Sequence, residues 1–171
     1  MPRLFYALWP DDDTRAALAE AAARIDLRDA SLVRPENLHI TVRFLGTISD
    51  ELTDQLRFSQ PVQGLGQFTL EINDVGWWRS SQVAWLAPLI VPPQMEQMVF
   101  KVQEHLAKWD ITPKKGPFMP HVTVARNARR APRVFGSIAV EWRVDSVALI
   151  LSKTEPVGAY YEVQNRWSLT G

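Results

Sequence analysis

The feature that most constrains the fold of this chain is a pattern that occurs twice. A short apolar strand ends at a proline, a helix and a loop follow, and the next strand opens with a histidine two residues before a threonine. The first copy runs from "RLFYALWP" to "HITVRFLG", and the second runs from "QVAWLAPL" to "HVTVARN". The two histidines, His39 and His121, lie 82 residues apart, whereas stacked repeats have periods of roughly 20 to 50 residues. The pattern therefore predicts two related lobes that face one groove, and not a solenoid.

The remaining segments predict an α+β chain. Acidic or serine caps, prolines at the start and helical composition predict helices at residues 11–25, 49–58 and 92–109. Alternating or continuous apolar runs predict strands, and the C-terminal third contains strands only. The predicted strands are residues 3–10, 39–46, 68–78, 82–89, 121–127, 137–144, 145–152 and 159–169.

Composition narrows the class of protein. With 171 residues and 46% apolar composition, we expect one domain over residues 1–171, made of two intertwined lobes. The sequence has no cysteine, which excludes disulfides, thiolate metal ligands and a cysteine nucleophile. No basic start followed by a long apolar run is present, so we expect a soluble, cytoplasmic protein.

The net charge limits how the chain could bind a nucleic acid. Nineteen basic and nineteen acidic residues balance, so the chain lacks the overall charge that drives sequence-blind binding to long nucleic acids. A polyanionic partner must be bound locally. Basic residues do cluster after position 110, where they form either a solvated loop or a local anion site: Lys114, Lys115, Arg126, Arg129, Arg130 and Arg133.

The two His-x-Thr strands carry the candidate chemistry. Side chains alternate along a strand, so His39 projects with Thr41, and His121 projects with Thr123. The apolar residues between them fill the other face. One such histidine alone would most simply be a core imidazole bonded to backbone, but two at equivalent positions favour a function. His105 lacks the motif and is assigned to the surface or boundary of a helix.

Two imidazoles with two hydroxyls suit displacement at phosphorus. One imidazole takes a proton from water and the other gives one to the departing oxygen, while the hydroxyls hold phosphoryl oxygens. No metal is needed, and we expect no cofactor. Zinc is the chemical alternative, but a catalytic zinc needs a third protein ligand, and Glu36, Asp50 and Glu141 are unspecific candidates.

These residues resemble the signature of the 2H phosphoesterase superfamily, and most closely its RNA 2',3'-cyclic phosphodiesterases, the LigT-like 2'-5' RNA ligases. The resemblance covers nearly the whole chain. It is carried by "RLFYAL", "NLHITVRFLG", "DVGWWRSSQVAWLAP", "GPFMPHVTVAR" and "LILSKTEPVGAYYEVQNRWSLT". It implies a bilobal fold, in which two pseudo-symmetric, antiparallel-rich sheets face a central cleft and helices pack outside.

The resemblance also implies an activity and residue roles. The implied reaction is hydrolysis of an RNA or nucleotide 2',3'-cyclic phosphate to the 2'-phosphate, together with a reversible 2'-5' ligation. By position, His39 would be the proton donor and His121 the proton acceptor, with Thr41 and Thr123 on the phosphate. The near-symmetric motifs alone do not assign donor and acceptor.

Two arginines and several aromatic residues are further candidates, although each arginine could instead be a plain surface charge. Arg126 matches a recurrent basic position, but strand parity places it opposite His121, so a bend or bulge would have to turn it toward the cleft. Arg43 shares parity with His39 and lies about 13 Å along the strand, near a neighbouring phosphate of a longer RNA. Aromatic residues in family-like segments could stack on a base, and Phe5 is the one we assign to substrate binding; the others are Tyr6, Trp77 and Trp78.

Two alternatives to this enzyme stay open at this point. The chain could be a non-catalytic RNA-binding module of the same fold, or a related phosphodiesterase that acts on another cyclic phosphate. We expect a monomer that acts on RNA ends or nucleotides bearing a cyclic phosphate, without a membrane partner. Glu155 and Glu162 are acidic where related sequences are often more basic, which affects the expected preference for RNA length.

Overall fold

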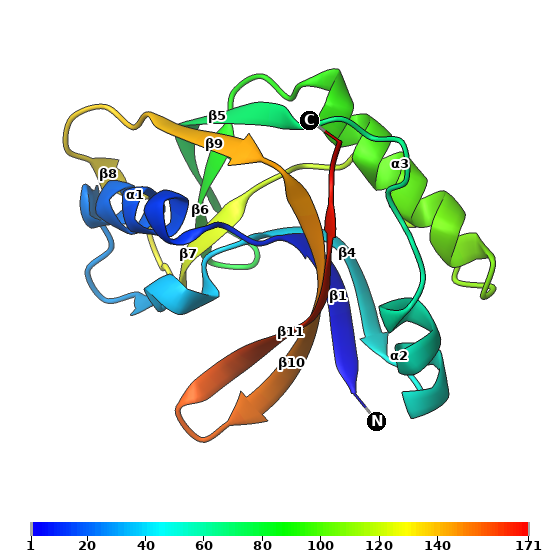
Figure 1. Ribbon diagram of the computed structural model, residues 1–171. Coiled ribbons are helices and arrows are strands. Elements are labelled where there is room, and N and C mark those ends of the chain that lie inside the picture. Colours follow the sequence, from blue (N-terminus) through cyan, green and yellow to red (C-terminus); the bar gives the residue numbers. More distant parts are fainter. Residues whose placement is uncertain (1, 171) are drawn as a thin grey trace.

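The computed structural model describes residues 2–170, which form a mostly antiparallel sheet with three α-helices packed against it (Figure 1). The nine-stranded sheet has the order β11-β10-β1-β4-β7-β6-β5-β9, with β3 paired to β7 beside this path. The first half comprises β1 (Arg3–Leu8), β4 (Ile40–Thr47), β10 (Ser146–Glu155) and β11 (Gly158–Ser168). The second half comprises β5 (Phe68–Trp78), β6 (Val83–Pro88), β7 (Val122–Arg126) and β9 (Val140–Val144).

The strand order reflects the internal repeat. From the centre outward the first half is β4, β1, β10 and β11, and the second half is β7, β6, β5 and β9. The helix α1 (Asp12–Ala23) connects β1 toward β4, and α3 (Pro93–Ala107) connects β6 toward β7. The two predicted lobes are therefore present. Their sheets are joined into one because Ile40 of β4 pairs with Val122 of β7.

The predicted elements match the structure closely. The helix α1 has Asp11 as its N-cap, and α2 (Asp50–Arg57) has the predicted Ser49, whose hydroxyl accepts from the Leu52 amide. The sequence did not indicate the two-residue strands β2 (Ile25–Asp26), β3 (Ser31–Leu32) and β8 (Arg133–Val134), nor the 3-10 turn η1 (Pro35–Asn37). Such short strands depend on partners distant in sequence and carry no periodic signal.

One face of the sheet is covered by the helices and holds the main core. Alternate strand residues such as Leu4, Ile40 and Val122 are fully buried there, together with Leu18 of α1 and Met98 of α3. The opposite face carries a much smaller apolar cluster, formed by Phe5, Ala7, Ala148 and Ile150. This second face is therefore the one available for polar chemistry.

The strands contain bulges that change which face a side chain occupies. In the β1–β4 pair, Ala7 lies opposite Thr41 and Tyr6 lies opposite Arg43, so Val42 is an extra residue. In the β6–β7 pair, Trp85 lies opposite Thr123 and Ala84 lies opposite Ala125, so Val124 is extra. A bulge of this kind reverses the alternation beyond it.

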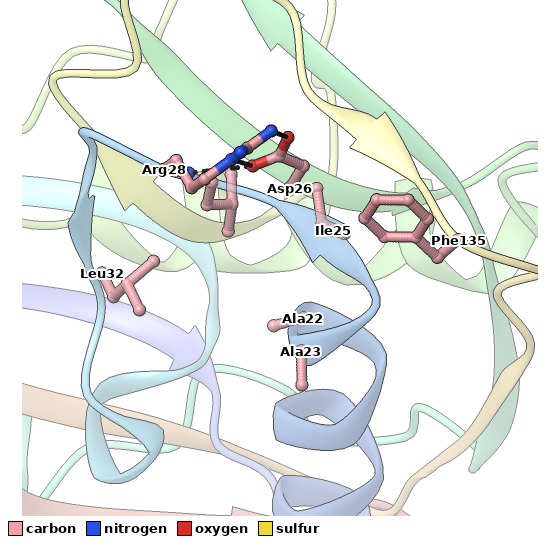
Figure 2. A pocket seen from close by; sticks show the side chains of 8 residues that line it. Ala22, Ala23, Ile25, Asp26, Arg28, Leu32 and Phe135 are labelled. Atoms are coloured by element: carbon pink, nitrogen blue, oxygen red, sulfur yellow. Dashed lines mark hydrogen bonds and ion pairs between the residues drawn. The ribbon is translucent and has the colours of Figure 1, made fainter.

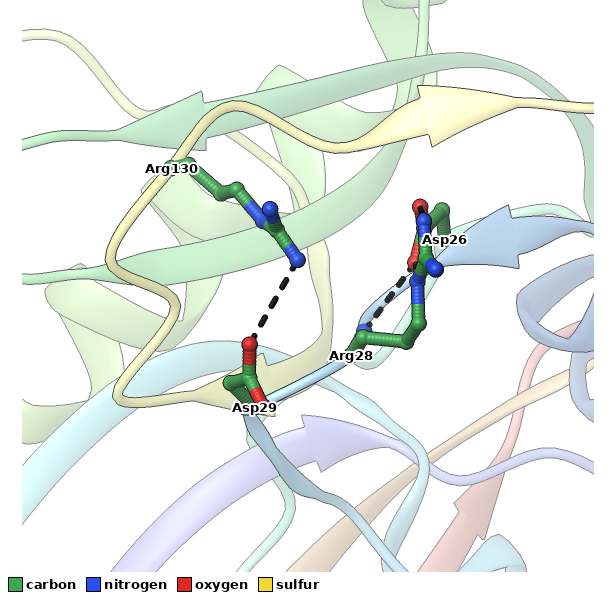
Figure 3. A network of polar contacts seen from close by, with 4 residues as sticks. All are labelled: Asp26, Arg28, Asp29 and Arg130. Atoms are coloured by element: carbon green, nitrogen blue, oxygen red, sulfur yellow. Dashed lines mark hydrogen bonds and ion pairs between the residues drawn. The ribbon is translucent and has the colours of Figure 1, made fainter.

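The end of α1 is tied to the second half by the small β2–β8 pair. Arg28 bonds Asp26 at 2.6 Å, and Arg130 reaches Asp29 at 3.4 Å (Figure 3). Arg130, one of the clustered basic residues, thus has a carboxylate partner within the chain. Exposed pairs of this kind contribute little stability, so they fix the position of the loop more than they strengthen the fold.

No helix within residues 2–170 is both long enough and apolar enough to cross a bilayer.

Candidate active site

The β4–β7 pair brings the two His-x-Thr motifs together. Ile40 lies opposite Val122 in antiparallel register, so the residues that flank this pair also oppose each other: Thr41 is across from His121, and His39 is across from Thr123. The two histidines are then diagonal neighbours, with Cα atoms about 7–8 Å apart. All four residues are partly buried on the face opposite the helices. Two imidazoles and two hydroxyls therefore surround one small area.

The two imidazoles are held by equivalent hydrogen bonds. His39 Nδ1 lies 2.6 Å from the carbonyl oxygen of Asn37, and His121 Nδ1 lies 2.8 Å from that of Met119. A carbonyl oxygen only accepts, so each Nδ1 carries the proton and each Nε2 of the neutral ring is free to exchange one. Each carbonyl belongs to the residue two positions before its histidine, as the internal repeat predicts.

Aromatic rings surround His39. Its ring centroid lies 5.0 Å from Phe5, 5.6 Å from Trp9 and 5.3 Å from Tyr161, and Tyr161 meets it edge-on. Burial lowers the pKa of His39 from 6.5 to about 4, against the Asn37 hydrogen bond, which raises it. Arg126, His121 and Arg15 lower this pKa further by their charge. In the ligand-free site, His39 is therefore neutral near pH 7.

His121 has a more open environment. One ring contacts it: Trp78 lies edge-on at 4.5 Å. Burial again lowers the pKa of His121, the Met119 hydrogen bond raises it, and the positive charges of Lys114 and Arg126 lower it. A neutral imidazole with a free Nε2 can accept a proton, which is the property required of a general base.

The two threonines differ in their contacts. Thr41 Oγ1 lies 3.1 Å from His39 Nε2, and because this nitrogen is unprotonated in the neutral ring, the hydroxyl donates to it. Thr123 projects beside Trp85 from the neighbouring strand β6. Both hydroxyls lie next to an imidazole from the other strand, where they could also donate to an anion.

Arg126 reaches the cleft through the bend that strand parity required. Val124 is the extra residue of the β7 bulge, and both Val124 and Ala125 are buried. Arg126 therefore emerges on the same side as Thr123, where it lines a cavity together with His39 and Thr41. Its charge acts on both histidines, so it is placed to neutralise an anion between them.

Arg43 is placed differently from the parity prediction. The extra residue Val42 turns Arg43 to pair with the buried Tyr6, so it no longer shares the face of His39 and Thr41. Its Nη2 donates to the carbonyl oxygen of Thr112 at 2.5 Å, which ties the loop after α3 to β4. Arg43 still borders a cavity beside His121, and contact with a distant phosphate remains a prediction.

The aromatic residues separate into packing and exposed groups. Phe5 is only 3% exposed and lies against the ring of His39, so little of its surface is open, and its role in substrate binding stays a prediction. Tyr6 is fully buried on the helix side of the sheet, and Trp77 donates to the Ala128 carbonyl at 2.7 Å. Sequence reasoning missed Phe44, which the bulge turns to the cleft face and which is 49% exposed.

Trp9 and Tyr161 were also missed as neighbours of His39. Trp9 precedes Pro10 at the end of a predicted strand, and Tyr161 belongs to a C-terminal hairpin far away in sequence. Neither position carries a local signal for proximity to an imidazole. Trp9 follows Leu8, which pairs with Ile40, so the β1–β4 register sets it beside His39. Tyr161 depends on how β10 and β11 fold back beside β1.

Two cavities flank the histidine pair. The cavity beside His39 has a volume of about 340 Å³ and is bounded by β1, β4, β10 and β11. The cavity beside His121 has a volume of about 660 Å³ and extends over Trp78 and Lys114 toward α3. Thr41 and Phe44 border both cavities. Volumes of this size are typical of sites for small ligands.

With one histidine left outside this site, no other region can combine two imidazoles with two hydroxyls. A cavity of about 590 Å³ near the end of α1 is lined mainly by apolar residues such as Ile25 and Phe135 (Figure 2). No group of three or more His, Asp or Glu side chains suited to a metal ion occurs within residues 2–170. The Asp26–Arg28 pair at that cavity offers no imidazole or hydroxyl for acid–base chemistry.

His105 differs from its predicted place at the helix surface or boundary, because it is buried. It is 5% exposed, and its Nε2 lies 2.6 Å from the hydroxyl of Ser59. Its ring also contacts Trp109 edge-on at 4.9 Å. His105 therefore serves packing between α3 and the segment after α2, on the opposite side of the sheet from the cleft.

Comparisons with known proteins identify the family of the chain. A model of the 2'-5' RNA ligase superfamily matches residues 10–155. The RNA 2',3'-cyclic phosphodiesterase of Thermus thermophilus is 32% identical over 188 residues, covering 99% of this chain and 91% of that protein. The Escherichia coli protein of the same name is 28% identical over 176 residues, covering 98% of this chain and 97% of that protein.

Solved structures give the same result for the fold. The crystal structure of E. coli LigT complexed with 3'-AMP superposes with a TM-score of 0.84 at 26% identity, covering 99% of both chains. The structure of TT0787 of Thermus thermophilus superposes with a TM-score of 0.82 at 29% identity, covering 99% of this chain and 98% of that one. The bilobal α+β fold expected from the sequence is thereby confirmed.

Proposed function

The chain belongs to the 2'-5' RNA ligase superfamily, and from this premise we propose that it hydrolyses RNA or nucleotide 2',3'-cyclic phosphates to 2'-phosphates, with His39 and His121 as acid and base. The curated relatives it matches are named RNA 2',3'-cyclic phosphodiesterase. The observation that carries the residue assignment is the β4–β7 pairing, which sets two imidazoles diagonally around one area with a hydroxyl beside each.

The reaction follows from an in-line displacement. His121 takes a proton from a water molecule as the water oxygen attacks phosphorus. The bond from phosphorus to the ribose 3' oxygen breaks, and His39 gives its proton to that oxygen. The product is a 2'-phosphate with a free 3' hydroxyl. Both protons move through imidazoles, so the step needs no metal ion.

The protonation states fit this scheme once substrate is bound. His39 is neutral in the ligand-free site, because burial holds its pKa near 4. A phosphodiester anion between the histidines favours the imidazolium and raises the pKa of His39. Binding of the substrate therefore supplies the charge that makes His39 an acid, while His121, whose pKa is lowered, acts as the base.

The other residues stabilise charge at phosphorus. Thr41 and Thr123 donate hydroxyl protons to the phosphoryl oxygens, which carry more charge in the transition state. In that state Thr41 exchanges its bond to His39 Nε2 for one to phosphate. Arg126 adds a full positive charge from β7. Together these groups replace the water that would solvate the anion outside the cleft.

The same geometry supports ligation. A ribose 5' hydroxyl can take the place of water, so that His121 removes its proton and the 5' oxygen bonds to phosphorus. Loss of the 3' oxygen then leaves a 2'-5' phosphodiester, and the reverse step cleaves it. Both histidines come from one chain, so we propose that the enzyme acts as a monomer. We propose that it acts on RNA in the cytoplasm.

One assay tests the proposal. The purified protein is incubated with adenosine 2',3'-cyclic phosphate and with cyclic-ended oligoribonucleotides in excess chelator, and the phosphomonoester is identified by nuclear magnetic resonance. We expect the 2'-phosphate as the sole product. A 3'-phosphate product would contradict the assigned leaving group, and binding without turnover would favour a non-catalytic RNA-binding module.

A further inference from the structure

The cavity beside His39 extends well beyond the reacting groups. Its inner end is bordered by His39 and Thr41, and its outer end by Arg3 of β1 together with Ser152 and Thr154 of β10. The register pairs Arg3 directly with Ser152, so the two side chains share the cleft face. A cyclic phosphate held between the histidines would not fill this outer end.

Arg3 is available to bind a ligand. Its guanidinium lies over the ring of Phe44 at 5.4 Å, and within the described residues 2–170 it forms neither an ion pair nor a side-chain hydrogen bond. The rings of Phe44 and Phe5 lie 6.5 Å apart, and Phe5 lies 5.0 Å from His39. A row of aromatic rings thus leads from the catalytic imidazole to an uncommitted positive charge.

Among residues 2–170, no carboxylate lines this cavity. Strand alternation directs the acidic residues of the β10–β11 hairpin to its other face, where Lys153 bonds Glu162 at 2.8 Å. Besides His39 and Ala159, the lining consists of two arginines, Arg3 and Arg126, with threonine, serine and tyrosine residues and two phenylalanines. Guanidiniums and hydroxyls without a competing carboxylate are the donors that bind phosphate.

The proposed reaction decides which part of the substrate lies here. In an in-line displacement, the leaving 3' oxygen is on the side of the acid and the water is on the side of the base. With His39 as the acid, the ribose lies on the His39 side of phosphorus. The cavity that continues from His39 to Arg3 is then the space open to the 5' substituent of that ribose.

We propose that Arg3, with Ser152 and Thr154, forms a subsite for a second phosphate, the one on the 5' oxygen of the nucleotide that carries the cyclic phosphate. This inference rests on the proposed function. In an RNA strand that phosphate is the linkage to the preceding nucleotide. The subsite makes the enzyme prefer cyclic phosphates at RNA ends, or on 5'-phosphorylated nucleotides, over cyclic nucleoside phosphates with a free 5' hydroxyl.

The test compares two substrates that differ only in the second phosphate. Adenosine 2',3'-cyclic phosphate and its 5'-phosphorylated form are hydrolysed at low ionic strength, and the ratio of their kcat/KM values is measured. We expect the 5'-phosphate to raise kcat/KM about tenfold in the unmodified protein, the scale of one charge-assisted contact. Arg3→Gln should bring the ratio close to one, and added salt should reduce the ratio in the unmodified protein.

Two variants provide controls. Arg143→Gln removes an exposed strand arginine on β9, at the far edge of the sheet, and should leave the ratio unchanged. Lys114→Gln removes the positive charge beside His121. If the kcat/KM ratio falls to about one in Lys114→Gln but is unchanged in Arg3→Gln, the 5'-phosphate binds in the cavity beside His121. The inference is then wrong. A ratio near one in the unmodified protein overturns it as well, while the hydrolase assignment stands.

A binding measurement separates this inference from the proposed function. The affinities of adenosine 2',5'-bisphosphate and adenosine 2'-phosphate are measured by calorimetry, without turnover. Tighter binding of the bisphosphate that is lost in Arg3→Gln supports the subsite even if neither cyclic nucleotide is hydrolysed. Equal affinities in the unmodified protein refute the subsite, whether or not the protein is an active hydrolase.

Discussion

His39 and His121 occupy equivalent positions in the two halves of the sheet, but the first ring lies among three aromatic side chains and the second contacts one. The strand frame and the Nδ1 hydrogen bonds are the same in both halves. Phe5 and Trp9 belong to the first copy of the repeat, whereas Tyr161 lies outside the repeated unit. Tyr161 belongs to β11, which extends with β10 past the neighbouring strands at the bottom of Figure 1, whereas the corresponding outer strand β9 has only five residues.

This comparison indicates how a duplicated motif can acquire two roles. The repeat supplies two identical proton-transfer groups at one phosphorus. The unequal outer strands then give the imidazoles different surroundings, and burial is the largest cause of the lowered pKa of each. His39, the more enclosed ring, depends more on the charge of the substrate for its protonation. Such dependence couples the acid to substrate binding.

The largest expected effect comes from removing either imidazole. His39→Ala and His121→Ala should each lower kcat by about 100- to 10,000-fold, the usual scale for a positioned acid or base. Steady-state hydrolysis of adenosine 2',3'-cyclic phosphate measures this, with His105→Gln as the control outside the cleft. If one of the two cleft variants keeps near-normal kcat, the comparison reduces to one catalytic histidine and one structural one.

Removing the hydroxyl of Thr41 or Thr123 should lower activity less than removing an imidazole, and by a similar factor at both positions. Thr41→Val and Thr123→Val keep the branched shape and remove a phosphate donor, so we expect kcat/KM to fall about tenfold in each. Threonine to serine at either position keeps the donor and should restore most of the rate. A much larger loss in Thr41→Val than in Thr123→Val would mean that the ligand-free bond to His39 Nε2 also orients the acid.

Sequence reasoning captured the parts of this site that repeat. Strand alternation placed His39 with Thr41 and His121 with Thr123, and the duplicated pattern predicted that the two pairs would meet. Both follow from local periodicity, which side-chain size and β-propensity impose directly. The helices were predicted because their caps and composition are local too, as Ser49 at the start of α2 illustrates.

The remainder depends on contacts between distant segments. The bulges at Val42 and Val124 reverse parity, and so determine that Phe44 and Arg126 face the cleft while Arg43 does not. Neither bulge contains a glycine that would indicate it in the sequence. The aromatic enclosure of His39 likewise needs Trp9, which the β1–β4 pairing sets beside it, and Tyr161, which arrives through the packing of β10 and β11 beside β1.

A substitution in the β10–β11 hairpin should make the surroundings of His39 more like those of His121. Tyr161→Leu removes one aromatic wall of His39, which should admit water and raise the pKa of His39 from its value of about 4 toward 6.5. A histidine titration followed by nuclear magnetic resonance measures this shift. Because the acid must be protonated, kcat/KM falls as pH rises above its pKa, so a raised pKa moves that alkaline limb to higher pH.

The neighbouring tyrosine offers a matched control. Tyr160 lies on the other face of the hairpin and is 45% exposed, so Tyr160→Leu should change neither the titration of His39 nor the pH profile. The titration of His121 should stay constant in both variants, since Tyr161 does not contact its ring. An equal shift of both histidines in Tyr161→Leu would show that the hairpin acts on the whole cleft and not on one half.

The smallest expected effect on kcat/KM comes from changing the packing of the tryptophans beside His121. The ring of Trp85 lies directly against Gly76, where a Cβ atom would overlap it, and Trp85 contacts Trp78, which in turn contacts His121. Gly76→Ala should therefore displace Trp85, lower the free energy of unfolding by about 1–3 kcal/mol, and reduce kcat/KM two- to threefold through His121.

Gly66→Ala, whose Cβ would meet only an ordinary contact at 3.8 Å, should leave kcat/KM and the free energy of unfolding close to those of the unmodified protein. If Gly76→Ala destabilises the fold but leaves kcat/KM and the titration of His121 unchanged, Trp78 does not position that imidazole, and the two half-sites differ more than their shared frame suggests.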